Sequence, residues 1–84
     1  MPKHLSLDNF PRSKADDDKI SKLCLATFNT PSGKAVLKYL RSITIEVVSG
    51  PNISDAELRH LEGQRYLVGI IERRFIKGAK LKNE

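Results

Sequence analysis

The chain has 84 residues, 39% of them hydrophobic and 6% aromatic, and a formal net charge of +5. A chain this short forms one domain at most, with a small core and a free energy of unfolding on the order of 5 kcal/mol. The single cysteine, Cys24, excludes an intramolecular disulfide and a thiolate-rich zinc site, and we expect it to be a small buried apolar residue. No run approaches the roughly 20 apolar residues of a membrane helix, and Met1–Ser6 lacks the apolar core of a signal peptide. We therefore expect a protein that is intracellular or assembled inside a cell, without a membrane partner.

Residues 1–15 are predicted to form an extended N-terminal arm, because Pro2 and Pro11 interrupt regular structure. The arm also carries three apolar side chains, Leu5, Leu7 and Phe10. Since a pure linker does not need them, we expect these side chains to dock onto this domain or onto a neighbouring protein. The alternative is a flexible tail.

The first helix is predicted from about Asp17 to Thr27. Three successive carboxylates open it, and we expect them to cap free amides at the positive end of the helix dipole: Asp16, Asp17 and Asp18. They do not form a calcium loop, which needs a central glycine and a distal glutamate. Helical spacing predicts a buried stripe made of Ile20, Leu23, Cys24, Thr27 and Phe28.

The segment Phe28–Leu40 predicts a sharp corner between two helices. Thr30 can accept a hydrogen bond from the first free amides of the second helix, and Pro31 suits its first position. This second helix is expected to run from about Pro31 to Ser42. Its apolar face is predicted to consist of Ala35, Val36, Tyr39 and Leu40.

A row of cations lies on the other face of the second helix. Lys34, Lys38 and Arg41 recur at i, i+4 and i+7, so their side chains share one side. We regard this row as a candidate anion contact; the alternative is an ordinary solvated face.

The β-branched run Ile43–Val48 is predicted to be an extended connector or a frayed continuation of the second helix. Ser54 and Glu57 then form a capping box, which predicts a third helix from about Asp55 to Lys77 that Gly78 ends. Residues 79–84 follow as a basic C-terminal tail.

Gly63 and Gly69 lie inside the predicted third helix, and each lowers the stability of that helix by about 1 kcal/mol relative to alanine. Such a cost suggests that another backbone approaches closely. We expect the first or second helix there; the alternative is a contact with another subunit. Arg65 is expected to pair with Glu62 at i, i+3 or to reach the carbonyls near Phe28.

The residues provide no catalytic constellation. Ser32-Gly33-Lys34 lacks the upstream glycine and strand of a phosphate loop, and no Ser-His-Asp set can be assembled. We therefore expect no enzyme, no cofactor and no metal site. Non-specific phosphate binding is the physical competitor, because eight cations could contact an anion: Lys34, Lys38, Arg41, Arg73, Arg74, Lys77, Lys80 and Lys82.

Two motifs carry a family resemblance across roughly residues 17–77. The corner Phe28–Leu40 reads F-x-T-P-x-G-K-x-V-L-x-x-L, and Leu61–Arg65 contains E-G-x-R, followed by Val68-x-x-Ile71. In this order they resemble a family of small virion-associated structural proteins of short-tailed bacteriophages, encoded near portal and capsid genes.

The resemblance implies a non-enzymatic structural role in the phage particle, near the portal. The implied partners are portal, capsid or internal virion proteins, packaged DNA or further copies of the chain. The implied location is the virion, or the bacterial cytoplasm during assembly. Leu5, Leu7, Phe10, Gly63 and Arg65 are the candidate partner-binding residues.

We thus predict an all-α, three-helix domain at residues 16–78, between the arm and the basic tail. A minor structural protein of a phage virion or prophage is the favoured function. The first alternative is a small non-specific nucleic-acid-binding protein that uses its lysine and arginine face. A regulator that occupies a host protein through the third helix is the second alternative.

Overall fold

The computed structural model describes residues 6–83, and its chain forms three helices in this range. Helix α1 spans Lys14–Phe28, α2 spans Pro31–Ser42 and α3 spans Asp55–Lys82. The predicted all-α fold is therefore confirmed. Leu5, one of the predicted docking residues, lies outside the described residues.

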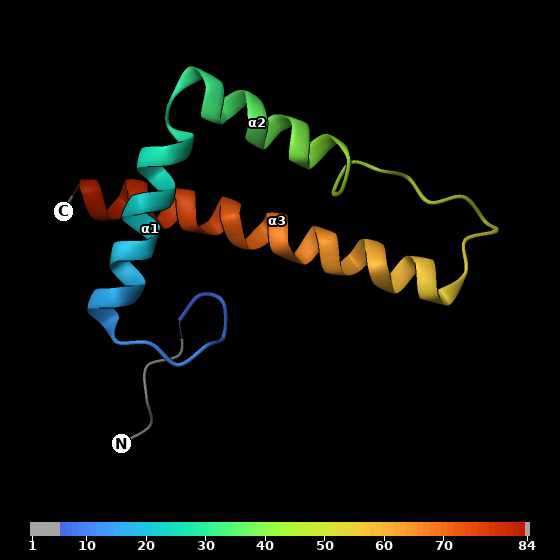
Figure 1. The fold of residues 1–84 in the computed structure, drawn as a ribbon, viewed down its shortest axis with the longest axis horizontal. Coiled ribbons are helices and arrows are strands. Elements are labelled where there is room, and N and C mark those ends of the chain that lie inside the picture. Colours follow the sequence, from blue (N-terminus) through green and yellow to red (C-terminus); the bar gives the residue numbers. More distant parts are fainter. Residues whose placement is uncertain (1–5, 84) are drawn as a thin grey trace.

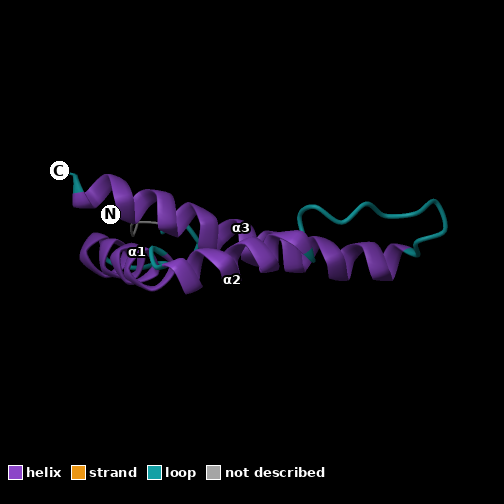
Figure 2. Ribbon diagram, turned by 90° about the horizontal axis from the view of Figure 1, so that it is seen from above, coloured by secondary structure: helices purple, strands orange, loops and turns teal. Residues whose placement is uncertain are grey.

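The helices form a thin layer rather than a thick bundle. Helix α1 crosses α3 near the C-terminal end of α3, and α2 then runs back along α3 toward a long connector (Figure 1). The molecule measures 46 × 39 × 14 Å, and the second view shows how thin the layer is (Figure 2). Because a layer has little interior, Leu25 and Val68 are the buried apolar residues among those described.

Helix α1 begins earlier than predicted, at Lys14, because Ser13 caps it. The Ser13 hydroxyl oxygen accepts a hydrogen bond from the Asp16 amide at 3.1 Å. The prediction that all three aspartates serve as caps is wrong for Asp17, which is buried and forms ion pairs with cations of α3. Asp17 lies in the first turn of α1, but its carboxylate binds cations of α3 rather than serving as a cap.

The buried side of α1 also differs from the predicted stripe. Asp17, Ser21 and Leu25 are buried at intervals of four residues, whereas Leu23 is 56% exposed and Thr27 is exposed. The reason is that α1 packs on a part of α3 whose buried groups are an arginine and a glycine. A hydrophobic pattern could not anticipate a polar contact face.

The predicted corner between α1 and α2 is present. The Thr30 hydroxyl oxygen accepts a hydrogen bond from the Gly33 amide at 2.9 Å, and Pro31 occupies the first turn. A Cβ atom at Gly33 would collide with the Thr27 carbonyl oxygen and the Cα atom of Phe28. This corner therefore requires glycine for close approach of two backbones.

The apolar face predicted for α2 is largely exposed. Tyr39 is 60% exposed, Ala35 and Val36 are exposed as well, and Leu40 is half-buried. Helix α2 instead turns its Leu37 and Arg41 side toward α3, where these residues share a groove with Phe75.

The connector between α2 and α3 begins as a frayed continuation of α2, which is one of the two predicted alternatives. Turns continue from the end of α2, held by a hydrogen bond from the Thr44 hydroxyl to the Leu40 carbonyl at 2.7 Å and one from the Glu46 amide to the Arg41 carbonyl at 3.1 Å. Irregular chain follows from residue 47.

Helix α3 starts as predicted but does not end at Gly78. The Ser54 hydroxyl oxygen accepts a hydrogen bond from the Glu57 amide at 3.1 Å. The helix then continues for 28 residues to Lys82, which gives a length of about 42 Å. Residues 79–82 of the predicted tail are thus helical.

Gly78 marks the place where α1 and α3 cross. A Cβ atom there would collide with the Ser21 carbonyl oxygen and lie 2.9 Å from the Leu25 Cβ atom. Gly63 and Gly69 have no such neighbour, since a Cβ atom at either would meet nothing within 4 Å. The prediction that these two glycines pack internally is therefore wrong, and the internal close approach belongs to Gly78.

Replacing these glycines by alanine should have opposite effects on stability. Gly78→Ala should lower the free energy of unfolding by about 1 kcal/mol or more, because the backbone collision outweighs the gain in helix propensity. Gly63→Ala is the matched control and should raise it by up to about 1 kcal/mol. Urea denaturation followed by circular dichroism measures both, and equal effects would contradict this account of the crossing.

Candidate interaction surfaces

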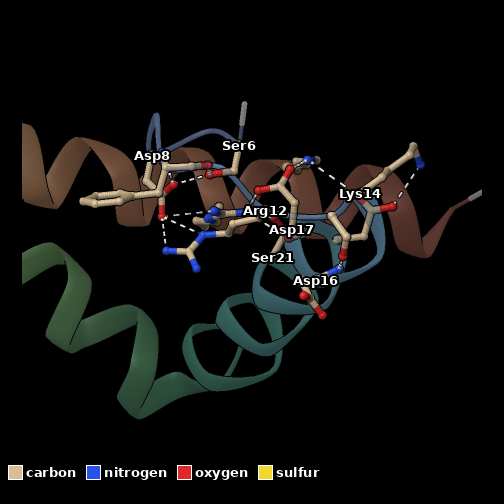
Figure 3. Close-up of polar contacts among 12 residues, drawn as sticks. Ser6, Asp8, Arg12, Lys14, Asp16, Asp17 and Ser21 are labelled. Atoms are coloured by element: carbon tan, nitrogen blue, oxygen red, sulfur yellow. Dashed lines mark hydrogen bonds and ion pairs between the residues drawn. The ribbon is translucent and has the colours of Figure 1, made fainter. Parts of the chain in front are cut away.

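The N-terminal segment folds back onto the helices around Asp8. Its carboxylate accepts hydrogen bonds from the Ser6 hydroxyl, from the Phe10 amide at 3.1 Å and from Arg12 Nη2 at 2.9 Å (Figure 3). Asn9 adopts a φ of 68°, a conformation that asparagine tolerates better than most residues. Residues 6–12 thus form a compact turn rather than an extended arm.

Arg74 lies at the centre of a buried ion cluster between this turn, α1 and α3. Its side chain is 2% exposed, and Nη1 donates to the Asp17 carboxylate at 2.5 Å, the Asp17 carbonyl at 2.9 Å and the Ser21 hydroxyl at 3.0 Å. Nη2 lies 3.5 Å from the Asp8 carboxylate. One guanidinium therefore joins three segments of the chain.

Lys77 completes the cluster on the side open to solvent. Its ammonium group pairs with the buried Asp17 carboxylate and lies 3.4 Å from Asp18. Asp18 in turn binds Lys14 at 3.0 Å, one turn earlier on α1. Within this acidic run, cations of α3 neutralise Asp17, whereas Asp18 pairs with one cation of its own helix and one of α3.

Two carboxyl groups of the cluster have lowered pKa values. The pKa of Asp8 falls well below its ordinary value of 3.8, chiefly because of the hydrogen bond from Arg12 and then because of the one from Ser6. The pKa of Asp18 is lowered as well, mainly by its hydrogen bond with Lys14. Both groups favour the folded state in their ionised form.

Three of the eight predicted anion contacts form ion pairs within the molecule, and the prediction is wrong for Arg74, because its side chain is buried. Arg74 is buried with Asp17, and Lys77 pairs with two aspartates. Arg41 Nη1 donates to both carboxylate oxygens of Glu72 at 2.8 Å, and Arg41 Nε lies 3.4 Å from the Glu46 carboxylate. The hydrogen bonds with Glu72 are the largest cause of the raised pKa of Arg41. The predicted cation row on α2 retains Lys34 and Lys38.

The remaining cations outnumber the remaining carboxylates. Within residues 6–83, eight exposed cations form no ion pair: Lys19, Lys22, Lys34, Lys38, Arg59, Arg73, Lys80 and Lys82. Within the same residues, the exposed carboxylates without an ion pair are Asp16, Asp55 and Glu57, which all lie in the first turns of helices. Internal pairing therefore leaves a positive surface.

Of the three apolar residues predicted to bind a partner, Leu7 and Phe10 lie among the described residues, and they differ in exposure. Leu7 is half-buried and lines a hollow with Arg73, Ile76 and Lys80 of α3, so it docks on its own domain. Phe10 is 63% exposed, with the Arg12 guanidinium 5.8 Å from its ring centre. Phe10 remains available to a partner.

Arg65, also a predicted partner-binding residue, holds the connector. It pairs with Glu62 at 2.7 Å, as one alternative predicted, and donates to the carbonyls of Thr44 at 2.9 Å and Val47 at 2.5 Å. The prediction that it reaches carbonyls near Phe28 is wrong. Arg65 is therefore engaged internally, whereas Gly63 lies open on the surface.

Exposed apolar side chains are numerous for so small a chain. The large ones among the described residues are Phe10, Leu23, Val36, Tyr39, Ile43, Val47, Val48, Leu58, Tyr66, Leu67 and Ile76. They come from the turn, all three helices and the connector. Since isolated exposed apolar residues are normal but extended sets mark interaction sites, these surfaces are candidates for protein contacts.

The sequence reading missed the roles of Asp8, Asp17 and Ser21. A weak signal was present, because Asp17, Ser21 and Leu25 fall at i, i+4 and i+8 and could share one face. The position of Asp17 also fits a role at the helix end, where carboxylates are common. Nothing local indicates that Arg74, 57 residues away, would bury it.

The described residues contain neither a metal-binding cluster nor a membrane-spanning helix. No group of three or more His, Cys, Asp or Glu side chains is placed to hold a metal ion in the part of the chain that the structure describes. Within the same part, none of the helices has the length and apolar character needed to cross a membrane.

Comparison with known proteins identifies a phage protein family. Residues 24–82 match the family described as Bbp19-like phage protein. This match includes the second part of α1 and all of α2 and α3, but not the N-terminal turn. No curated protein and no solved structure matches the chain.

Removing the buried guanidinium should destabilise the fold strongly. Arg74→Met should lower the free energy of unfolding by about 3 kcal/mol or more, because the buried Asp17 carboxylate then loses its main partner. Arg59→Met, on the same helix but exposed and unpaired, is the control and should stay within about 0.5 kcal/mol. Chemical denaturation measures both, and a mild effect of Arg74→Met would contradict a central role for the cluster.

Acid should weaken the fold through Asp8 and Asp18. Because their pKa values are lower in the folded state, their stabilising contribution is present above about pH 4 and is lost as the pH falls toward the folded values. Asp8→Asn should flatten the pH profile of thermal unfolding below about pH 4, whereas Asp16→Asn, which removes an unpaired carboxylate, should change it much less. Equal profiles for the two variants would speak against the ion cluster as the acid-sensitive element.

Proposed function

This chain belongs to the Bbp19-like phage proteins, and we propose that it is a non-enzymatic minor structural protein of a phage virion or prophage. In this role it binds other particle proteins, near the portal, and resides in the virion or, during assembly, in the bacterial cytoplasm. Portal, capsid and internal virion proteins are its proposed partners.

The imbalance between buried and exposed apolar side chains supports this role most directly. Two apolar residues are buried among those described, whereas eleven large apolar side chains are exposed. A layer 14 Å thick presents both of its faces to contacts. Assembly components commonly complete their apolar burial at interfaces, and a small domain gains stability in that way.

Binding to nucleic acid is the second candidate, and a specific observation favours it. Residues 6–83 contain eight exposed cations without an ion pair but three exposed carboxylates without one, so the exposed surface carries a net positive charge. Lys34 and Lys38 lie one turn apart on α2, at one groove with Arg41. Such a surface would contact phosphates without reading bases, and packaged DNA is the available polyanion in a particle.

Particle association distinguishes the two functions. With virions of the phage or prophage that encodes the chain, we expect the protein to co-purify through nuclease treatment and moderate salt, because protein contacts are less salt-sensitive than phosphate contacts. Quantitative mass spectrometry of banded particles gives the measurement. Absence from the particles would refute the structural role.

A charge-reversal variant tests whether particle association depends on DNA binding. Lys34→Glu with Lys38→Glu should abolish any salt-sensitive retention of random-sequence DNA in a mobility shift and leave particle association intact. If the same variant is lost from particles while the wild-type chain binds DNA as a monomer, the nucleic-acid function replaces the structural one.

A further inference from the structure

One side of α3 carries an exposed stripe that no other helix covers and that the N-terminal turn borders at Tyr66 and Ile76. Its apolar members are Leu58, Tyr66 and Ile76, which are 38%, 52% and 54% exposed. Gly69 lies between them at helical spacing and has nothing within 4 Å of where its Cβ atom would be. Since Ile76 is two residues from Gly78, which packs on α1, the stripe faces away from α1.

Charged side chains of opposite sign occupy the two ends of this α3 stripe. Asp55 and Glu62 belong to its N-terminal half, and Arg73 and Lys80 belong to its C-terminal half. All four are exposed. The spacing of three or four residues keeps them on the same side as the apolar members. The stripe is therefore acidic at one end and basic at the other.

We propose that this stripe binds the same stripe of a second copy of the chain, with the two α3 helices antiparallel around a two-fold axis. In a two-fold pair, residues at equal distances on either side of the axis meet. An axis between Leu67 and Val68 places Tyr66 against Gly69, and it places Leu58 one position away from the residue directly opposite Ile76. The same register places Asp55 against Lys80 and Glu62 against Arg73, so every charged pair has opposite signs.

A hollow on the stripe supplies the place for the partner helix. It measures about 260 Å³ and is lined by Leu7, Arg73, Ile76, Lys77 and Lys80. Its apolar side chains are thus surrounded by three cations. The N-terminal end of a second α3 brings the complementary set, an apolar Leu58 between carboxylates. Two-fold symmetry uses this contact twice.

The pairing also explains why a glycine, Gly69, occurs within α3 at a position where an added Cβ atom would meet nothing inside the molecule. A glycine costs helix stability, and its missing side chain permits close approach of a neighbour. The Tyr66 side chain is positioned for that contact, because Nδ2 of the Asn9 side chain donates a hydrogen bond to its hydroxyl oxygen at 3.2 Å. The ring of one copy can therefore cover the open backbone at Gly69 of the other.

Sedimentation of the full chain across a dilution series up to millimolar concentration tests the pairing. We expect a reversible dimer. Ile76→Ser should weaken it about tenfold or more, whereas Leu67→Ser, an exposed site on the same helix but off the stripe, should not. Glu62→Lys and Arg73→Glu should each weaken the dimer, and their combination in one chain should restore it.

Crosslinking fixes the orientation. With Cys24→Ser as background, Leu58→Cys combined with Ile76→Cys should give a disulfide-linked dimer on mild oxidation, and Leu58→Cys combined with Leu67→Cys should not. A chain that stays monomeric at every concentration would overturn the proposal and leave the particle role untouched. An oligomer indifferent to Ile76→Ser and to both charge reversals would overturn it as well.

Discussion

The buried pair of Asp17 and Arg74 is the contact on which the arrangement of this chain depends. It joins α1 to α3 across 57 residues of sequence and, through Asp8, attaches the N-terminal turn to both. Gly78, one turn beyond Arg74, lets the two helices approach where an added methyl group would collide with Ser21. A buried ion pair adds little net stability by itself, but breaking it leaves an uncompensated charge, so it acts chiefly to fix the crossing.

A crossing held by polar groups has consequences for the surface. The apolar side chains that a larger core would have collected remain outside, on α2, the connector and α3. Internal ion pairs use equal numbers of cations and carboxylates, so the positive excess of the composition remains on the exposed surface. The same molecule thus has apolar surface for binding proteins and basic surface for binding a polyanion, which supports the proposed role in the phage particle.

The predicted cationic site residues fall into two groups, those that remain exposed and those that bind groups within the molecule. Lys34, Lys38, Arg73, Lys80 and Lys82 remain exposed, as a reading of the sequence by charge expects. Arg41, Arg65, Arg74 and Lys77 have internal partners, two of them from segments more than 50 residues away. Charge and spacing show that a cation is present, but they do not show whether a distant carboxylate has already neutralised it.

The sequence by itself determined the local structure: three helices, the Thr30–Gly33 corner and the Ser54 cap, because capping and helical period depend on residues a few positions apart. It also determined the excess of positive charge. The tertiary structure decided which face of each helix is buried, that Gly78 rather than Gly63 or Gly69 lies at a crossing, and that α3 continues past it. These outcomes depend on which helix meets which, and in a thin layer fixed by one buried ion pair, hydrophobic periodicity does not encode that choice.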